Sequence, residues 1–208
     1  MQSRRGGAVR IRGLDLDVFD GVYPPSEDTL LLMDAVRVES AIRGLELCSG
    51  TGAVGLSVAG CVEFMIEIDL SPVAAMNTLH NFRKNEVQAH IIVGDLFSPV
   101  RGEFDLIMIN PPYLPDGDGA LGDLAWSGGA SGRSVIDRFL SDVCSFLSSG
   151  GRAYMLQSSL NGIKESLETA EGFGLDAEVV ARRDFDFESL VVIKMERGGN
   201  GLGQAWKS

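Results

Sequence analysis

The sequence predicts an α/β fold in which a largely parallel sheet is closed by an antiparallel pair of strands. Short apolar or β-branched runs alternate with helical patterns along most of the chain, as in successive β-α-β units. The last two extended runs, at residues 176–182 and 190–195, have no room between them for a crossover helix, so they predict a hairpin. A glycine turn follows the first parallel strand, where open α/β sheets bind ligands.

Each element follows from a local pattern. Ser26 comes after two prolines and is suited to cap a helix that continues to about residue 36. Ser71 and Pro72 predict the start of a helix over 73–84 in the same way. The parallel strands are predicted at residues 44–48, 63–68, 90–93, 104–109 and 152–157. The remaining helices are predicted at residues 53–59, 134–147 and 161–172, with a long Gly- and Asp-rich loop over 114–131.

Composition and charge limit the class of ligand. The 208 residues, 45% hydrophobic, predict a single domain over 1–208 with flexible ends at 1–12 and 197–208. The net charge is −11 in total and −17 for residues 13–196, because the two ends carry six basic groups and no acid. Broad phosphate contacts need clustered Lys and Arg. The acidic body therefore argues against a nucleic-acid partner.

Other features point to the cytoplasm. No apolar run reaches the roughly 18 residues that a membrane helix needs. The three cysteines form no CxxC pair, so we expect neither a disulfide framework nor a metal site, and a reducing cytoplasm is the default.

The first chemical motif runs from Glu46 through Cys48, Gly50 and Gly52 at the end of the first parallel strand. Its tight turn lets the backbone approach a nucleotide-like ligand, but the dinucleotide fingerprint GxGxxG is incomplete. The Glu46 carboxylate can accept the ammonium group of an amino-acid-like cofactor and would repel a pyrophosphate. This favours S-adenosylmethionine and a class I methyltransferase fold, which is a Rossmann-like seven-stranded sheet with a C-terminal antiparallel hairpin. A structural turn beside a solvated Glu46 is the alternative.

Acidic residues also follow the next two strands. Asp69 ends the second strand, where a carboxylate can accept ribose hydroxyls. Glu67 competes for this role because side chains alternate along a strand, but Asp69 directly precedes the turn. Asp95 follows the third strand and can accept the exocyclic amine of adenine, while Leu96 can offer a backbone N–H and an apolar wall to the ring.

The decisive motif is Asn110-Pro111-Pro112-Tyr113 at the end of the fourth strand. The prolines stiffen the backbone and remove N–H donors. The Asn110 side-chain oxygen and the Pro111 carbonyl can accept both hydrogens of a planar –NH₂ group, and the Tyr113 ring can pack on that group. The motif therefore predicts methyl transfer to an amide or amino nitrogen on an sp² carbon.

These motifs resemble amino-methyltransferases that act on adenine, guanine and glutamine. Residues 22–32 and 125–139 narrow the resemblance to the HemK family of glutamine methyltransferases, in its short archaeal and eukaryotic branch. The resemblance covers about residues 20–195. It implies a glutamine in a class I peptide-chain release factor as substrate and a small zinc-binding activator protein as partner.

The resemblance also implies functions for single residues. Thr29 would contact the cofactor from the first helix. Cys48 replaces the family's first glycine, which adds bulk beside the methionine part of the cofactor. The remaining implied cofactor and substrate residues are Glu46, Asp69, Asp95, Leu96 and Asn110.

Alternatives stay open at this point. A methyltransferase acting on the N6 of adenine or the amino group of guanine in DNA or RNA would use the same pocket. A catalytically idle scaffold is a second alternative, although the intact Asn110 speaks against it. Arg133 and Arg138 are candidates for steering an acidic substrate, with helix surface the simpler role for Arg138. Trp126 is a candidate for a substrate lip or for a packing anchor.

Overall fold

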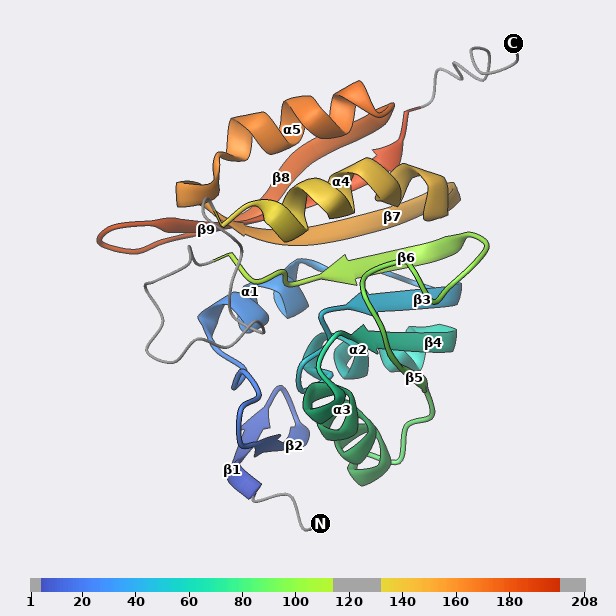
Figure 1. Ribbon diagram of the computed structural model, residues 1–208, viewed down its shortest axis with the longest axis vertical. Coiled ribbons are helices and arrows are strands. Elements are labelled where there is room, and N and C mark those ends of the chain that lie inside the picture. The colour runs from blue at the N-terminus through green and yellow to red at the C-terminus, as the bar shows by residue number, and fades with distance from the viewer. Residues whose placement is uncertain (1–4, 114–131, 199–208) are drawn as a thin grey trace.

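The computed structural model describes residues 5–113 and 132–198 (Figure 1). One mixed seven-stranded sheet has the order β5-β4-β3-β6-β7-β9-β8, and β1 and β2 form a separate pair. The strands are β1 (Arg5–Ile11), β2 (Leu14–Phe19), β3 (Ala41–Leu47), β4 (Val62–Asp69), β5 (His90–Val93), β6 (Phe104–Ile109), β7 (Leu147–Ser158), β8 (Leu175–Asp184) and β9 (Ser189–Arg197). The helices are α1 (Glu27–Ala35), α2 (Ala53–Val58), α3 (Pro72–Lys84), α4 (Ser134–Phe146) and α5 (Ile163–Gly172).

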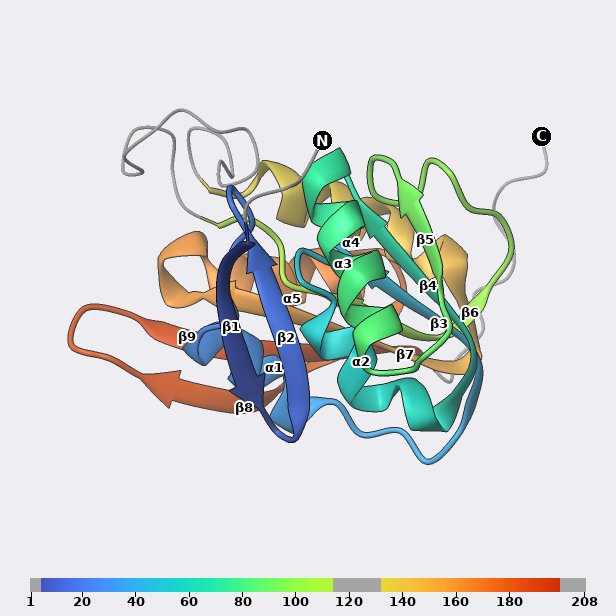
Figure 2. The ribbon, with the colours of Figure 1, turned by 90° about the horizontal axis from the view of Figure 1, so that it is seen from below.

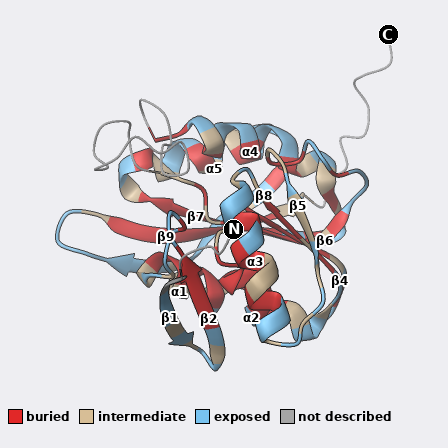
Figure 3. Cartoon of the chain, turned by 60° about the horizontal axis from the view of Figure 1, so that its bottom comes forward, coloured by how far each residue is buried: buried red, intermediate tan, exposed pale blue. Residues whose placement is uncertain are grey.

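Helices cover both faces of the sheet. Leu45 and Ile107 point to the face that α4 and α5 cover, where Phe139 and Leu140 of α4 are fully buried. Leu106 and Met108 point to the opposite face, where they join Leu32 of α1 and Phe82 of α3. β6, in the middle of the sheet, is accordingly buried at every residue except the half-buried Asp105, and buried residues line the neighbouring strands (Figure 3). This explains why β6 has a continuous apolar sequence rather than an alternating one.

The parallel strands and the closing hairpin confirm the predicted fold class. β3 pairs in parallel with β4 and β6, while β9 is antiparallel to both β7 and β8. The predicted capping is also confirmed: Ser71 accepts a hydrogen bond from the Ala74 N–H, and Pro72 opens α3. No helix in the described part of the chain is long and apolar enough to cross a membrane.

Three local predictions are wrong. The N-terminal segment is not a flexible end from residue 5 onward, because β1 pairs with β2 through the register Val9↔Leu16. The strand predicted at 152–157 begins earlier, because β7 follows α4 directly at Leu147. The segment predicted as flexible at 197–208 is wrong at its first residue, because Arg197 still belongs to β9. Residues 199–208 lie outside the described residues.

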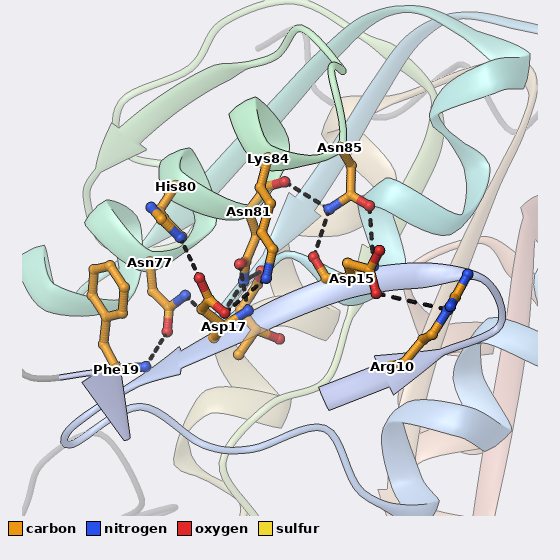
Figure 4. A network of polar contacts seen from close by, with 10 residues as sticks. Arg10, Asp15, Asp17, Phe19, Asn77, His80, Asn81, Lys84 and Asn85 are labelled. Atoms are coloured by element: carbon orange, nitrogen blue, oxygen red, sulfur yellow. Dashed lines mark hydrogen bonds and ion pairs between the residues drawn. The ribbon is translucent and has the colours of Figure 1, made fainter. Parts of the chain in front are cut away.

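α3 lies beside β2 (Figure 2). Asparagine side chains of α3 and of its C-cap bind the free edge of this strand (Figure 4). Asn77, Asn81 and Asn85 recur at every fourth position and so share one helix face. Their side-chain oxygens accept the N–H groups of alternate β2 residues, at 2.7 Å for Phe19, 2.8 Å for Asp17 and 3.2 Å for Asp15. Their amide nitrogens donate back to the carbonyls of Asp17 and Asp15. The helix thereby substitutes for a neighbouring strand.

An ionic cluster reinforces this contact. The buried Asp17 carboxylate lies 2.6 Å from His80 Nε2 and 2.7 Å from Lys84 Nζ (Figure 4). Hydrogen bonds from Lys84 and then His80 lower the pKa of Asp17. Asn81 also donates to the Thr51 carbonyl at 2.9 Å. The hairpin is therefore joined through α3 to the turn that follows β3.

Candidate active site

A cavity of about 540 Å³ opens at the carboxyl ends of β3, β4, β5 and β6. These strands are parallel, so the residues that follow them meet at one edge of the sheet. All but one of the predicted cofactor-binding and catalytic residues line this cavity: Thr29, Glu46, Cys48, Gly50, Asp69, Asp95, Leu96, Asn110, Pro111 and Tyr113.

Gly52 is the exception. It adopts φ +75°, and a Cβ there would lie 2.8 Å from Thr78 and 2.9 Å from Phe82, both on α3. The structure therefore places this glycine against α3 instead of in the cavity lining. It is required for the close approach between the turn and the helix.

The turn after β3 has left-handed backbone at two lining residues. Cys48 has φ +56° and Gly50 has φ +54°. A side chain is disfavoured in this region by about 1 kcal/mol, which gives a physical reason for the glycine that the family resemblance implies in place of Cys48. Burial raises the pKa of the Cys48 thiol, with the nearby Asp69 adding to the effect, so the thiol stays neutral.

Glu46 is 3% exposed and accepts the Gly55 N–H at 2.7 Å. Burial raises the pKa of Glu46 to about 7. Glu67, the competitor of Asp69, is fully buried beside Glu46 and is absent from the cavity lining. The structure therefore places Asp69, not Glu67, at the cavity.

Asp69 is held by backbone donors. Its two carboxylate oxygens accept the N–H groups of Gly50 at 2.9 Å and Ser71 at 2.8 Å. Burial raises its pKa, while these two hydrogen bonds act in the opposite direction. Asp69 thus connects the turn after β3 to the start of α3.

The turn after β5 adds an ion pair to the rim. Asp95 accepts a hydrogen bond from Arg138 of α4 at 2.7 Å, and both residues line the cavity. Leu96 is 6% exposed and has φ +45°. Arg138 is thus part of the rim, whereas Arg133 is buried, donates to the Asn161 carbonyl and pairs with Asp137. The substrate-steering role considered for Arg133 is wrong, because its guanidinium is engaged inside the fold.

Asn110 is oriented by a residue of α1. Its amide nitrogen donates to Asp28 Oδ2 at 3.0 Å, a contact between residues 82 positions apart. This contact turns the side-chain oxygen away from Asp28. That oxygen is buried and has no hydrogen-bond partner among the described residues. Buried amide oxygens are normally hydrogen-bonded, so the cavity presents an acceptor ready for a donor from a bound molecule.

Tyrosine side chains flank Asn110. The Tyr113 side chain hydrogen-bonds with that of Tyr23, which also lines the cavity. Burial raises the pKa of Tyr113, and it raises the pKa of Tyr23 to about 12, so both phenols stay neutral. The Tyr113 carbonyl is fixed by the Asn161 amide at 3.0 Å.

Sequence reasoning missed Asp28, Tyr23 and the place of Arg138. In the sequence, Asp28 is an acid in the first turn of a helix, where the dipole favours negative charge, and nothing local indicates that it reaches Asn110. Tyr23 had a weak signal as an aromatic residue directly before two prolines. Trp126 and the other residues of the segment 114–131, for which the sequence predicts a loop, lie outside the described residues.

Comparison with known proteins agrees with this geometry. The pattern of the Methyltransferase small domain family matches residues 25–186. The chain therefore belongs to this family and is a methyltransferase, as its fold and site indicate.

Similar proteins narrow the assignment within the family. A Methanocaldococcus jannaschii protein named as a protein N5-glutamine methyltransferase is 34% identical over 194 residues, which cover 91% of this chain and 98% of that protein. Methyltransferase HEMK2 of Homo sapiens is 34% identical over 198 residues, covering 86% and 91%. The chain thus lies in the archaeal and eukaryotic HemK branch of N5-glutamine methyltransferases, which confirms the prediction from its motifs.

A solved complex extends the comparison to structure. The E. cuniculi Mtq2-Trm112 complex, described as methylating the eRF1 translation termination factor, contains a chain with a TM-score of 0.65 and 29% identity. The match covers 85% of this chain and 99% of that one.

Proposed function

We propose that this chain acts as a single methyltransferase domain that transfers a methyl group from S-adenosylmethionine to the side-chain amide nitrogen of a glutamine in a protein. The cofactor supplies an electrophilic methyl group on a sulfonium centre. The cavity has the donor and acceptor set that such a molecule needs, since carboxylates occur at the ends of β3 and β4 and an apolar wall is formed by Leu96.

The residues at this edge of the sheet contact different parts of the cofactor. Glu46 accepts the amino group of the methionine part, with Thr29, Cys48 and Gly50 beside it. Asp69 accepts ribose hydroxyls with the lone pairs that its two backbone donors leave free. Asp95 and Leu96 hold the adenine.

The observation that carries the proposal is the buried, unpartnered oxygen of Asn110 next to Pro111. An amide nitrogen is a weak nucleophile because its lone pair is delocalised. Two acceptors, the Asn110 Oδ1 and the Pro111 carbonyl, hold both N–H bonds of the glutamine amide and stabilise positive charge as it develops on nitrogen. Tyr113 packs on the planar group. No general base is required before transfer, because the proton can leave afterwards.

The substrate we propose is the glutamine of the Gly-Gly-Gln loop in a class I release factor. The E. cuniculi complex is described as acting on eRF1, and a Schizosaccharomyces pombe relative, 25% identical over 219 residues, is named an eRF1 methyltransferase catalytic subunit. The charge of −17 over residues 13–196 also favours a protein over a nucleic acid as the substrate. Release factors act in the cytoplasm, where we place this enzyme.

We further propose a small zinc-binding activator subunit as partner. The E. cuniculi relative was solved in complex with Trm112. In this chain β5 lies at one end of the sheet, and its last residue, Val93, is 54% exposed. An open strand edge with an apolar residue is suited to pairing with a second protein.

Mass spectrometry of release factors incubated with labelled cofactor tests the proposal, with and without co-purifying proteins. We expect one methyl group on the Gly-Gly-Gln glutamine, and at least about a hundredfold loss of rate in Asn110→Ala. Phe187→Ala, which alters a side chain that is 94% exposed, is the matched control. Identical label transfer by wild type and Asn110→Ala would contradict the proposal. Methylation of an oligonucleotide instead of the release factor would favour the nucleic-acid alternative.

A further inference from the structure

Two buried carboxyl groups lie side by side beneath the cavity. Glu46 of β3 and Glu67 of β4 are direct partners in the parallel register, so their side chains point to the same face of the sheet. Their exposed fractions are 3% for Glu46 and 0% for Glu67. Only Glu46 reaches the cavity lining.

No cation compensates this pair. The electrostatic partners of the two groups, within the part of the chain that the structure describes, are each other, the Gly55 N–H and Asp69. Both Glu67 oxygens have no hydrogen-bond donor among those residues. Two adjacent carboxylates without a cation cannot both be charged in a buried site. At least one proton must therefore be held between them.

The surroundings decide which group keeps that proton. Glu46 accepts the Gly55 N–H and faces the open cavity, and both features favour its charged form. Glu67 has neither. Burial and the neighbouring Glu46 charge raise the pKa of Glu67 well above its ordinary value.

Gly55 makes the arrangement possible. A Cβ at this position would lie 2.0 Å from Glu67 Oε1 and 2.8 Å from Glu46 Oε2. Any other residue would push the two carboxyl groups apart. The space needed for the pair thus comes from a glycine in α2.

We propose that Glu67 is a positioning residue: it stays protonated and donates a hydrogen bond to Glu46, which holds the Glu46 carboxylate charged and aimed at the cofactor's amino group. The inference rests on the proposed contact between Glu46 and the cofactor. An acid at position 67 thereby acts as a neutral donor, and the negative charge of the pair stays on the residue that faces the cavity.

The protonation of Glu67 is tested by infrared difference spectroscopy at about pH 9, where Glu46, with a pKa of about 7, is charged; wild type is compared with Glu67→Gln. We expect the carbonyl stretch of a protonated carboxylic acid in wild type and its loss in Glu67→Gln. Absence of that band from wild type would overturn the inference. This measurement does not depend on cofactor binding or on turnover.

The positioning role is tested by calorimetric titration with S-adenosylmethionine. Glu67→Gln keeps a neutral donor, so we expect its affinity to stay within about threefold of wild type. Glu67→Met has no donor, so we expect binding to weaken about tenfold, the effect of one charge-assisted hydrogen bond. The kcat at saturating cofactor should change less than about threefold in both. Melting temperatures check folding, and Glu67→Met should not melt lower, because apolar replacement of a buried ionisable group is often neutral or stabilising.

Two outcomes separate the inference from the proposal on which it rests. Equal affinity of Glu67→Met and wild type, or equal losses in Glu67→Gln and Glu67→Met, would overturn the role of Glu67. Unchanged affinity in Glu46→Gln would instead overturn the proposed cofactor contact of Glu46, while the infrared band would still report the proton on Glu67.

Discussion

At the scale of single residues, the site depends on side chains that are oriented by other side chains. Asn110 presents an unpartnered oxygen because its nitrogen is held by Asp28. Asp28 is itself 2% exposed and accepts the Thr29 N–H at 2.6 Å. The start of α1 therefore sets the direction of the amide that we propose binds the substrate.

Replacing Asp28 should change the orientation of the Asn110 side chain and leave cofactor binding largely intact. We expect Asp28→Ala to lower kcat by about ten- to a hundredfold, with cofactor affinity within about threefold of wild type. The kcat of Asp28→Asn, which keeps a hydrogen-bond acceptor, should lie between those of Asp28→Ala and wild type. Glu27→Ala is the matched control, because this neighbouring carboxylate pairs with Arg183 at the surface. Steady-state kinetics on the release factor checks the order of the variants, and equal kcat in Asp28→Ala and wild type would refute the orienting role.

Cofactor affinity should depend on pH through Glu46. Burial raises the pKa of this group to about 7, so below that pH it is protonated and must lose its proton to accept an ammonium group. We expect affinity to fall by about tenfold per pH unit as the pH drops below about 7, and to level off above it. Calorimetry at several pH values measures this dependence of cofactor affinity on pH. Glu46→Gln should bind the cofactor weakly, with an affinity that does not change with pH.

At the scale of elements, the N-terminal hairpin is the clearest difference between expectation and structure. Its sequence is rich in Arg and Gly, which favoured a flexible end. The signals that could have found it are the alternating apolar residues of β2 and the Arg12-Gly13 turn, where φ is +49° and +86°. Positive φ at both central residues is typical of a type I′ hairpin turn.

The asparagine face of α3 should control how firmly this hairpin docks. Asn81 is fully buried and bonds Asp17 N–H, Asp17 carbonyl and Thr51 carbonyl. We expect Asn81→Ala to lower the free energy of unfolding by about 2 to 3 kcal/mol, since it leaves buried backbone groups unpaired. Asn85→Ala, at the more exposed end of the same face, should cost less than about 1 kcal/mol. Urea unfolding checks both, and equal losses would contradict the burial argument.

The Asp17 cluster should also contribute a pH-dependent stability. Its hydrogen bonds to Lys84 and His80 lower the pKa of Asp17 in the folded state. A carboxyl group whose pKa is lower in the folded than in the unfolded state stabilises the fold at pH values above its unfolded pKa of about 4. This contribution is lost as the pH falls further. The drop in unfolding free energy below about pH 4 should therefore be smaller in Asp17→Asn. Identical acid profiles would contradict this role.

At the scale of the whole molecule, charge and fold act together. The cavity could chemically serve a nucleobase amine as well as a glutamine amide. The acidic body, −17 over residues 13–196, disfavours the approach of a phosphate backbone. The hairpin places Arg10 and Arg12 in ion pairs with Asp15 and Asp34, which further reduces the basic character of the N-terminal segment.

Binding to nucleic acid should accordingly be weak. We expect no complex with single- or double-stranded oligonucleotides below about 100 µM at physiological salt, the weak end of non-specific binding. Fluorescence anisotropy measures this directly. A sub-micromolar complex that weakens steeply with salt would favour the nucleic-acid alternative over the release factor.

Local sequence patterns are sufficient to predict the alternation of strands and helices and the grouping of Glu46, Asp69, Asp95 and Asn110 at one edge of the sheet. The physical reason is that residues directly following parallel strands must share that edge, whatever the details of packing. Only the folded structure shows that Glu67 is buried beside Glu46 and that Gly52 packs on α3 instead of lining the cavity. It also decided that Asp28 reaches Asn110 and that α3 binds β2. Such contacts join residues far apart in the chain, and they depend on how helices pack on the sheet, which no local pattern encodes.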